Sequence, residues 1–193
     1  MSEYVRRLRE KVGHDLLFWP SAAALVRNRD GKILLVQHVE GHWMLPAGAV
    51  DPGETPAEAA RREAREEASV QLKLVRVAGV FGGDPHFRMT YANGDEVAWV
   101  TTLFEANIVD GVPAPGDDEI ADVRWVTAAE AFELGISPST RHMLERLQEG
   151  SLSTPSRVLE RTPIHPPGQG TFPNAGPYEC FSRRGGDMTA GHP

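Results

Sequence analysis

The segment over residues 48–70 constrains the fold of this 193-residue chain more than any other part. Its sequence is GAVDPGETPAEAARREAREEASV, in which turns rich in glycine and proline lead into a helix rich in Ala, Glu and Arg. Glu63, Glu66 and Glu67 crowd one face of that helix, where like charges repel by about 0.2–0.5 kcal/mol per pair. Hard divalent cations prefer carboxylate and carbonyl oxygens. The segment therefore predicts a magnesium site.

The same helix also has the features of a solvated helix without a function. Glu58 and Arg62 form a favourable i, i+4 pair, and Arg62 and Glu66 form a second pair of reversed polarity. A stripe of small residues suits close packing on a sheet. The stripe consists of Ala57, Ala60, Ala64 and Ala68. The helix alone leaves both interpretations open, but the apolar residues 43–46 and the two successive turns over residues 48–53 favour a functional site.

With these parts in this order, the chain closely resembles the Nudix hydrolase family. The family signature runs Gly, five residues, Glu, seven residues, Arg-Glu, an aliphatic residue, any residue, Glu-Glu, any residue, Gly and an aliphatic residue. The matching positions are Gly48, Glu54, Arg62, Glu63, Ala64, Glu66, Glu67, Ser69 and Val70. The spacing is kept throughout, so chance does not account for the match.

Two positions depart from the family pattern. Ser69 stands where the family has glycine, just past the helix, where a left-handed residue would close the C-terminus; a non-glycine residue there typically costs about 1 kcal/mol. Ala47 stands where a second glycine often precedes Gly48, and its methyl group can narrow the pocket or alter the approach of substrate. Because the Gly48 carbonyl is kept, we expect both departures to leave catalysis largely intact.

The resemblance implies an α/β fold, the Nudix α/β/α sandwich, with a mixed β-sheet between helices over about residues 21–148. It also implies a hydrolase that needs Mg²⁺, with Mn²⁺ as a substitute. Such an enzyme cleaves a phosphoanhydride (pyrophosphate) bond in a nucleotide or nucleoside diphosphate derivative by metal-activated water. A bound divalent cation neutralises the repelling phosphate charge and lowers the pKa of that water.

The resemblance assigns roles to individual residues of the signature. The Gly48 carbonyl, Glu63 and Glu67 would bind the metal directly. Glu66 would be a further ligand or the base that activates water. The last two signature residues with a role, Arg62 and Glu54, would form a pair that holds the helix and the loop in register.

Another carboxylate from outside the signature often joins such a site, and two residues are candidates. Glu105 lies near the end of a predicted strand and is the position that we favour; its other interpretation is an exposed glutamate at a strand end. Glu119 lies in an acidic loop, GDDEI, and loops on a rigid scaffold frequently carry catalytic groups.

Composition restricts the partners and the compartment. The net charge of -7 argues against nucleic acid as the main partner, because phosphate backbones are bound by clustered Lys and Arg. The single cysteine, Cys180, cannot form an internal disulfide, so a cytoplasmic location is expected. Neither a signal sequence nor an apolar run of about 20 residues is apparent. We expect a small-molecule nucleotide or diphosphate substrate and no membrane, and a homodimer stays open.

Apolar periodicity and turn residues predict a helix first, then strands around the motif helix, and two helices last, an order that gives a mixed sheet held between helices. Helices are expected at residues 3–12, 128–134 and 139–148, and strands at 21–27, 33–38, 70–81, 87–91, 96–106 and 121–126. The first two strands are expected to pair through a turn at residues 28–31. Asn93-Gly94 predicts a type I′ hairpin, and Thr127 is expected to cap the second-last helix.

The chain divides by composition into three parts. Residues 1–20 form an N-terminal helix and lead-in, residues 21–150 the Nudix domain, and residues 151–193 a tail rich in proline and glycine. We expect no independent domain in the tail, because such segments bury too little apolar area to offset chain entropy. Three aromatic residues could still anchor it, and these are Phe172, Tyr178 and Phe181.

The substrate itself is poorly constrained by the sequence. Ser139 and Thr140 lie where relatives place polar residues that contact the base, although an ordinary helix N-cap explains them as well. Trp43 fits either the pocket floor or the core. Besides the hydrolase, two alternatives are a Nudix-fold nucleotide sensor that does not hydrolyse its ligand and an isomerase of prenyl diphosphates. Sensors often lose signature glutamates, whereas all four are present here, and the only cysteine lies far from the signature.

Overall fold

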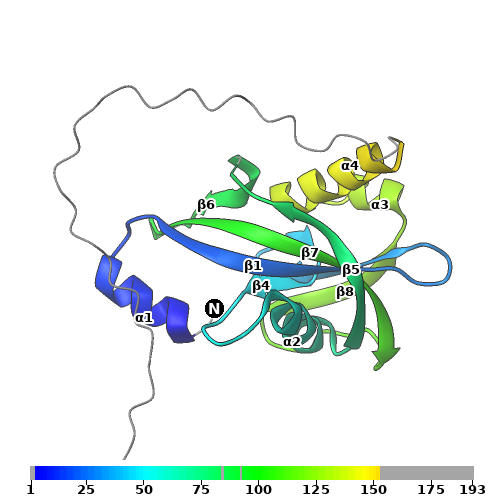
Figure 1. The fold of residues 1–193 in the computed structure, drawn as a ribbon, viewed down its shortest axis with the longest axis horizontal. Coiled ribbons are helices and arrows are strands. Elements are labelled where there is room, and N and C mark those ends of the chain that lie inside the picture. The colour runs from blue at the N-terminus through cyan, green and yellow to red at the C-terminus, as the bar shows by residue number, and fades with distance from the viewer. Residues whose placement is uncertain (1–2, 84, 92, 153–193) are drawn as a thin grey trace, which may run out of the picture. The chain divides into compact units, whose positions relative to one another are not determined.

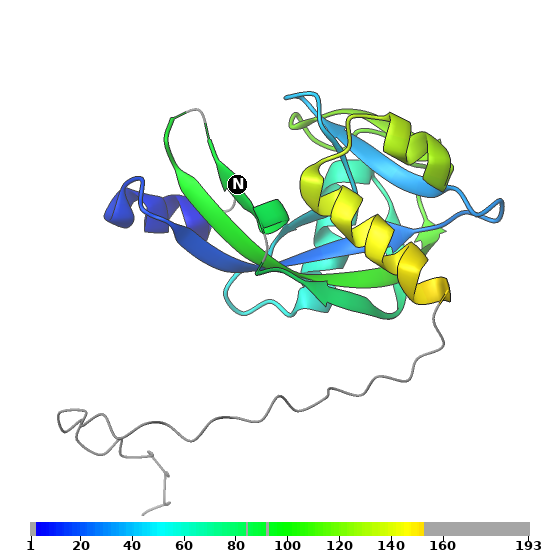
Figure 2. The ribbon, with the colours of Figure 1, turned by 90° about the horizontal axis from the view of Figure 1, so that it is seen from above.

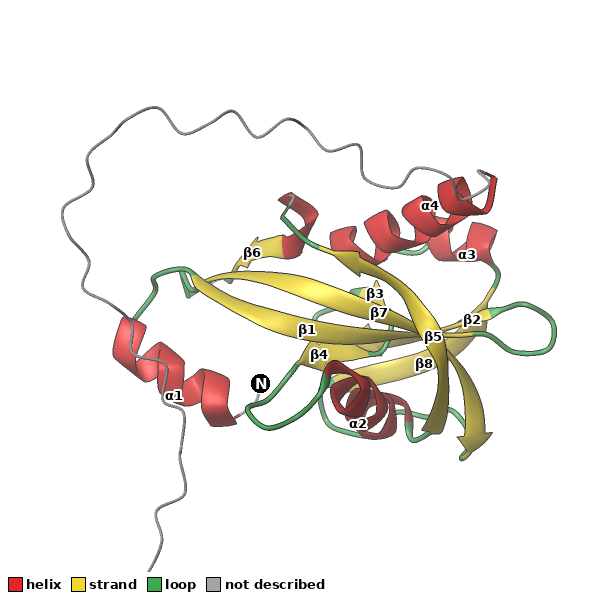
Figure 3. Ribbon diagram, viewed as in Figure 1, coloured by secondary structure: helices red, strands yellow, loops and turns green. Residues whose placement is uncertain are grey.

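Two β-sheets lie between helices in the computed structural model, which describes residues 3–83, 85–91 and 93–152. Helix α2 covers one side of the sheets, and α3 and α4 cover the other (Figures 1 and 3). All of these residues fall within one unit of the chain, Met1–Pro155. The predicted α/β/α sandwich is therefore confirmed.

The elements follow one another in an order close to the predicted one. The helices are α1 (Glu3–Val12), α2 (Pro56–Ala68), the short 3₁₀ helix η1 (Pro85–Phe87), α3 (Ala128–Glu133) and α4 (Pro138–Leu152). The strands are β1 (Leu17–Val26), β2 (Ile33–His38), β3 (Trp43–Met44), β4 (Ala47–Ala49), β5 (Gln71–Phe81), β6 (Arg88–Thr90), β7 (Glu96–Asp110) and β8 (Ile120–Val126).

The larger sheet is the predicted mixed sheet. Four of its five strands follow the order β4-β1-β7-β5, and the fifth strand, β6, pairs with β7. The central strands β1 and β7 run parallel, whereas β4, β5 and β6 pair antiparallel with their neighbours. A second sheet of three antiparallel strands, in the order β3-β2-β8, comes in addition.

The predicted pairing of the first two strands is wrong. β1 and β2 belong to different sheets, and one isolated bridge between Arg27 and Ile33 joins their ends. Residues 22–26 and 34–36 are at most 1 % exposed, as is typical of strands that are covered on both faces. Instead of pairing with each other, β1 pairs with β7 and β2 pairs with β8.

Successive side chains of β7 face different helical layers, because side chains alternate between the two faces of a strand. Phe104 packs with Ala59 and Ala60 of α2, whereas Leu103 belongs to the core cluster that includes Met143 of α4. Figure 2 looks onto α4 and shows it crossing the larger sheet. The predicted alanine stripe does face a sheet. Its buried members are Ala60, Ala64 and Ala68.

The hairpin predicted at Asn93 and Gly94 joins β6 to β7, but its turn type differs. The Gly94 amide donates to the Tyr91 carbonyl at 2.9 Å, and the Tyr91 amide donates to the Asp95 carbonyl at 2.9 Å. Gly94 has a φ of 89°, whereas Ser69 is the only non-glycine residue with positive φ in the described ranges. A type I′ turn needs positive φ at both central residues. The longer connection, from Tyr91 to Asp95, places Gly94 in the left-handed region.

Most element ends agree with the predictions. α1 matches its predicted range, and β1 begins at Leu17, ahead of the predicted start of the domain. Thr127 caps α3, as predicted. α4 extends from Pro138 to Leu152, past the predicted end of the domain, and residues 153–193 of the predicted tail lie outside the described residues. Within the described ranges, no helix has the length and apolar character needed to cross a membrane.

Candidate metal and active site

Both ends of α2 are fixed by local interactions that the sequence encodes. At the start, the Glu58 amide donates to the Thr55 hydroxyl at 3.2 Å, and the Thr55 amide donates to the Glu58 carboxylate at 2.8 Å. This capping box satisfies two amides of the first turn, and Pro56 suits the first helical position. At the end, Ser69 takes the predicted left-handed conformation with φ 56°. The acidic residues are thereby held in register with the turn before the helix.

Strand β4 meets the acidic face of α2 through two close contacts. The Ala47 amide donates to Glu67 Oε2 at 3.0 Å. The Glu63 carboxylate lies against Gly48, where an added Cβ would be only 1.9 Å from Glu63 Oε1. Real Cβ contacts essentially never fall below 3.0 Å, so a side chain at this position would displace the Glu63 carboxylate. The structure thus brings together Gly48, Glu63 and Glu67, three of the four groups expected to bind a metal.

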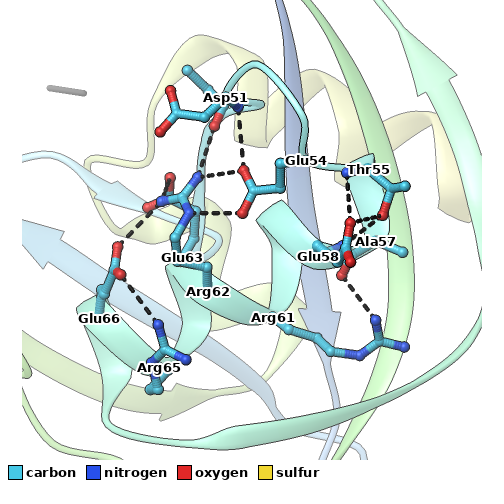
Figure 4. A network of polar contacts seen from close by, with 11 residues as sticks. Asp51, Glu54, Thr55, Ala57, Glu58, Arg61, Arg62, Glu63, Arg65 and Glu66 are labelled. Atoms are coloured by element: carbon cyan, nitrogen blue, oxygen red, sulfur yellow. Dashed lines mark hydrogen bonds and ion pairs between the residues drawn. The ribbon is translucent and has the colours of Figure 1, made fainter. Parts of the chain in front are cut away.

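Arg62 connects the turn to the helix through the network in Figure 4. Its Nε and Nη2 donate to the two carboxylate oxygens of Glu54 at 2.9 and 3.0 Å, and Nη2 also donates to the Ala49 carbonyl at 2.9 Å. Its Nη1 donates to Glu63 at 2.7 Å and to Glu66 at 3.1 Å. The guanidinium hydrogen bonds hold the pKa of Glu54 below its ordinary value. This geometry agrees with the orienting role expected for the Arg62 and Glu54 pair.

The face around Glu67 carries more negative charge than Arg62 can balance. Burial raises the pKa of the Glu67 carboxyl well above its ordinary value, and the charge of Glu63 raises it further. Burial also raises the pKa of Glu63, although the hydrogen bond from Arg62 opposes this change. Two half-buried or buried carboxylates side by side are stabilised when a cation shares them. The electrostatics therefore fit a metal site.

The acidic loop before β8 lies against the C-terminal half of α2. The Gly116 amide donates to the Glu67 carbonyl at 3.2 Å, and the Ala114 amide donates to the Ala68 carbonyl at 3.2 Å. The charge of Glu119 contributes to the raised pKa of Glu67, as does that of Asp117. Glu119 thus belongs to the same electrostatic environment as the signature glutamates.

Glu105 lies on the other face of the larger sheet. Its neighbours along β7, Phe104 and Ala106, pack with core residues of α2, so the Glu105 side chain points away from α2. There it accepts hydrogen bonds from the Arg76 guanidinium, one of them at 2.8 Å from Nε. The structure does not bring Glu105 to the acidic helix, and it is not part of the site described below.

The polar residues at the start of α4 make hydrogen bonds within the protein that stabilise the start of this helix. Thr140 is 2 % exposed, and its hydroxyl accepts from the Leu45 amide at 3.3 Å and from the Ser137 hydroxyl at 3.0 Å. The Thr140 amide donates to the Ser137 hydroxyl at 3.3 Å, so Ser137 caps the helix. Ser139 lies beside it, with 3.3 Å between the two serine hydroxyl oxygens. Trp43 is 5 % exposed and is a core residue.

Several contacts of the site could not be found from the sequence. They are made by the Ala47 amide and the Ala49 carbonyl, backbone groups that every residue carries. The Leu45 amide, bonded to Thr140, is a third such group. Only Gly48 of the signature indicated such a backbone contact, because the absence of a side chain there leaves room for the Glu63 carboxylate.

The donors present suit a hard divalent cation. The Gly48 carbonyl and the carboxylates of Glu63, Glu66 and Glu67 are all oxygen ligands, which Mg²⁺ and Mn²⁺ prefer. Among the described residues, no three carboxylate, imidazole or thiol side chains already surround one point. Glu63 and Glu66 instead bond to Arg62. The residues fit a metal by donor type and by charge, and Arg62 orients two of the carboxylates.

Comparison with known proteins agrees with this geometry. A family model described as NUDIX domain matches residues 17–147, which include every residue of the acidic helix and the turn before it. The chain belongs to the Nudix family. It is a Nudix pyrophosphohydrolase, an enzyme that acts on acid anhydrides in phosphorus-containing substrates.

This Nudix chain is similar to proteins from several organisms. Nucleoside triphosphatase NudI of Salmonella heidelberg is 36% identical over 132 residues, which cover 62% of this chain and 89% of the relative. The MutT NUDIX hydrolase of Burkholderia pseudomallei is 28% identical, with a TM-score of 0.55 over 67% of this chain and 97% of that chain. The MutT protein of Methanosarcina mazei Go1, 23% identical, shares the fold with a TM-score of 0.58 over 72% of this chain and 99% of that chain.

Proposed function

We propose that this Nudix enzyme hydrolyses nucleoside triphosphates in the presence of Mg²⁺, giving a nucleoside monophosphate and pyrophosphate. The proposal rests on the contacts that Glu63 and Glu67 make with strand β4. The pKa values of both carboxyl groups are raised, and a bound cation would stabilise their ionised forms. The substrate class follows the name of the NudI relatives, which are nucleoside triphosphatases.

The signature residues would hold the cation between helix α2 and strand β4. The Gly48 carbonyl, Glu63 and Glu67 are the proposed ligands, and Glu66 is a further ligand or the base. When bound, Mg²⁺ neutralises phosphate charge and lowers the pKa of a nearby water molecule. The Ala47 amide keeps Glu67 in place through its 3.0 Å hydrogen bond. The ligands are therefore oriented by backbone groups as well as by side chains.

Proton transfer requires a carboxylate that is close to the reacting phosphate and that water can reach. Glu66 is 44% exposed and is the most accessible carboxylate bonded to Arg62. Glu119 approaches from the loop before β8 and shares the electrostatic environment of Glu67. We propose Glu66 as the first candidate base and Glu119 as the loop carboxylate that assists it. Arg62 and Glu54 hold the turn against the helix and make no contact with phosphate in this scheme.

A substrate panel tests the proposal. Full-length protein with Mg²⁺ is assayed against nucleoside triphosphates, sugar nucleotides and dinucleoside polyphosphates, and released pyrophosphate and phosphate are measured. We expect turnover of at least one nucleoside triphosphate and its loss when Mg²⁺ is chelated. Tight binding of a nucleotide without any turnover would instead favour the sensor alternative.

A matched pair of variants tests the residue assignment. Glu66→Gln should lower kcat by at least about 10²-fold, the scale expected for a lost catalytic base or metal partner. Glu133→Gln makes the same chemical change on the exposed end of α3 and should leave kcat unchanged. Equal rates in the two variants would refute the assigned site. The homodimer and the cytoplasmic location stay predictions from the sequence, and size-exclusion chromatography with light scattering checks the first.

A further inference from the structure

A cavity of about 600 Å³ lies on the side of the larger sheet that α3 and α4 cover. Apolar and polar side chains line it in similar measure, and the apolar ones include Leu25, Leu144 and Leu147. This volume is within the range of cavities that bind small molecules, about 300–1,000 Å³, and such cavities combine an apolar lining with a few charged groups. The nucleotide chemistry proposed above does not use it.

The cavity is separate from the candidate active site. Glu105 lines the cavity, whereas its neighbours Phe104 and Ala106 pack with core residues of α2 on the opposite face of the sheet. The lining residues of α4 come from its later turns, while Thr140, which bonds to Leu45 near the acidic helix, lies in the first turn. Metal and phosphate bound at α2 would therefore not occupy this space.

The charged residues around the cavity favour an anion. Arg27, Arg76 and Arg146 line it together with the carboxylate of Glu105, and Arg146 also bonds to Glu149 of its own helix, so the arginines outnumber the carboxylates by one. This excess of positive charge occurs in a chain whose net charge is -7. Glu105 accepts from Nε and Nη2 of Arg76. A guanidinium has five N–H donors, so Arg76 can keep this pair and still offer donors to a ligand.

An apolar floor and a guanidinium rim together select for one chemical class. Arginine forks match carboxylate and phosphate groups geometrically, and a hydrocarbon body gains free energy when it is removed from water. We propose that this cavity binds a small amphipathic anion, a molecule with an apolar body and one carboxylate or phosphate group. The floor of Leu25, Leu144 and Leu147 would take the apolar body, and Arg27 and Arg146 would contact the anionic group.

Three probe molecules distinguish the contribution of the apolar body from that of the anionic group. Octanoate has both an apolar body and a charge, 1-octanol has the body alone, and inorganic phosphate has the charge alone. Binding to full-length protein is measured by titration calorimetry, and the site is located from amide NMR shifts. We expect saturable 1:1 binding of octanoate, with shifts around Ala78, Ala128 and Leu144. Binding of both other probes should be at least about tenfold weaker, because each lacks one set of contacts.

Two matched arginines provide the variant test. Arg146→Gln removes a guanidinium from the rim, and Arg6→Gln makes the same change in α1; their side chains are 61% and 59% exposed, and each pairs with a glutamate of its own helix. Octanoate affinity should fall about tenfold in the first variant, as expected for a lost charge-assisted hydrogen bond, and stay unchanged in the second.

The expected pattern also has clear contrary outcomes. Ala78→Leu adds volume at the cavity wall and should abolish octanoate binding while the melting temperature and the nucleotide kcat stay close to those of the parent chain. The proposal is overturned by an absence of saturable binding, by equal affinity for octanol or phosphate, or by equal effects of Arg146→Gln and Arg6→Gln. Shifts confined to residues 47–67 would likewise overturn it, because they would place the anion at the acidic helix.

Discussion

Replacement of Gly48 by alanine separates the stability of this Nudix enzyme from its activity. The added Cβ would lie 1.9 Å from Oε1 and 2.2 Å from Cδ of Glu63, and a tolerable contact needs at least 3.0 Å. The atoms in the way belong to the end of a flexible side chain. Glu63 can therefore rotate aside, and we expect Gly48→Ala to fold.

The magnitude of each effect follows from this displacement. The Glu63 carboxylate must move by about 1 Å or more, and a misplacement of that size at a catalytic group can cost about 10²-fold in rate. The same movement disturbs the 2.7 Å hydrogen bond from Arg62. Alanine in a strand is more favourable than glycine by about 0.5–1 kcal/mol, which offsets part of that loss. We expect kcat to fall about 10²-fold and the free energy of unfolding to change by at most about 1 kcal/mol.

Both quantities can be measured on the same protein preparation. Nucleoside triphosphate hydrolysis gives kcat, Mn²⁺ titration followed by electron paramagnetic resonance gives metal affinity, and urea unfolding gives stability. Gly135→Ala is the control, because a Cβ there meets nothing within 4 Å. If Gly48→Ala keeps a parental kcat and metal affinity, the position of Glu63 does not matter and the proposed ligand set is refuted.

Three further predictions concern the surroundings of the site. Glu119→Gln should lower kcat by about tenfold or more, whereas Glu105→Gln should leave it unchanged; the reverse result in the hydrolysis assay would contradict the placement of these residues on opposite faces. Thr140→Val leaves the Leu45 amide without its acceptor and should lower the free energy of unfolding by about 1–3 kcal/mol in urea titrations, with rescue by Thr140→Ser. Ser69→Gly relieves the left-handed φ and should raise that free energy by about 1 kcal/mol without changing kcat; a destabilised variant would show that the serine hydroxyl contributes more than the backbone costs.

Most elements of this fold could be predicted from the sequence because their signals are local, whereas the short strands β3 and β4 were not predicted. The α2 boundaries follow from Thr55, Pro56 and Glu58 at one end and from a left-handed Ser69 at the other, all within a few residues of the helix. The Thr127 cap of α3 is a signal of the same kind. Periodicity also indicated which face of α2 is buried, since alanines recur at helical spacing.

Strand pairing could not be predicted in the same way. The turn between β1 and β2 has hairpin residues, yet the two strands join different sheets. Their partners, β7 and β8, lie far along the chain, and the free energy of those long-range contacts decides the pairing. An apolar run that is buried on both faces, such as residues 22–26, carries no alternation from which a partner could be read.

The choice between Glu105 and Glu119 depends on the same kind of non-local information. Both are acidic residues near the end or the start of a predicted strand, and spacing along the chain does not distinguish them. On β7 the outcome depends on one residue of register: Phe104 and Ala106 pack with the core residues of α2, so Glu105 must point to the face that contains the arginine-lined cavity. In the loop, the Gly116 amide fixes the chain against the Glu67 carbonyl and so brings the charge of Glu119 to the acidic helix. A one-residue shift of β7 would turn Glu105 toward α2 and leave Glu119 where it is, and therefore the Glu105→Gln variant tests the strand register as directly as it tests the chemistry.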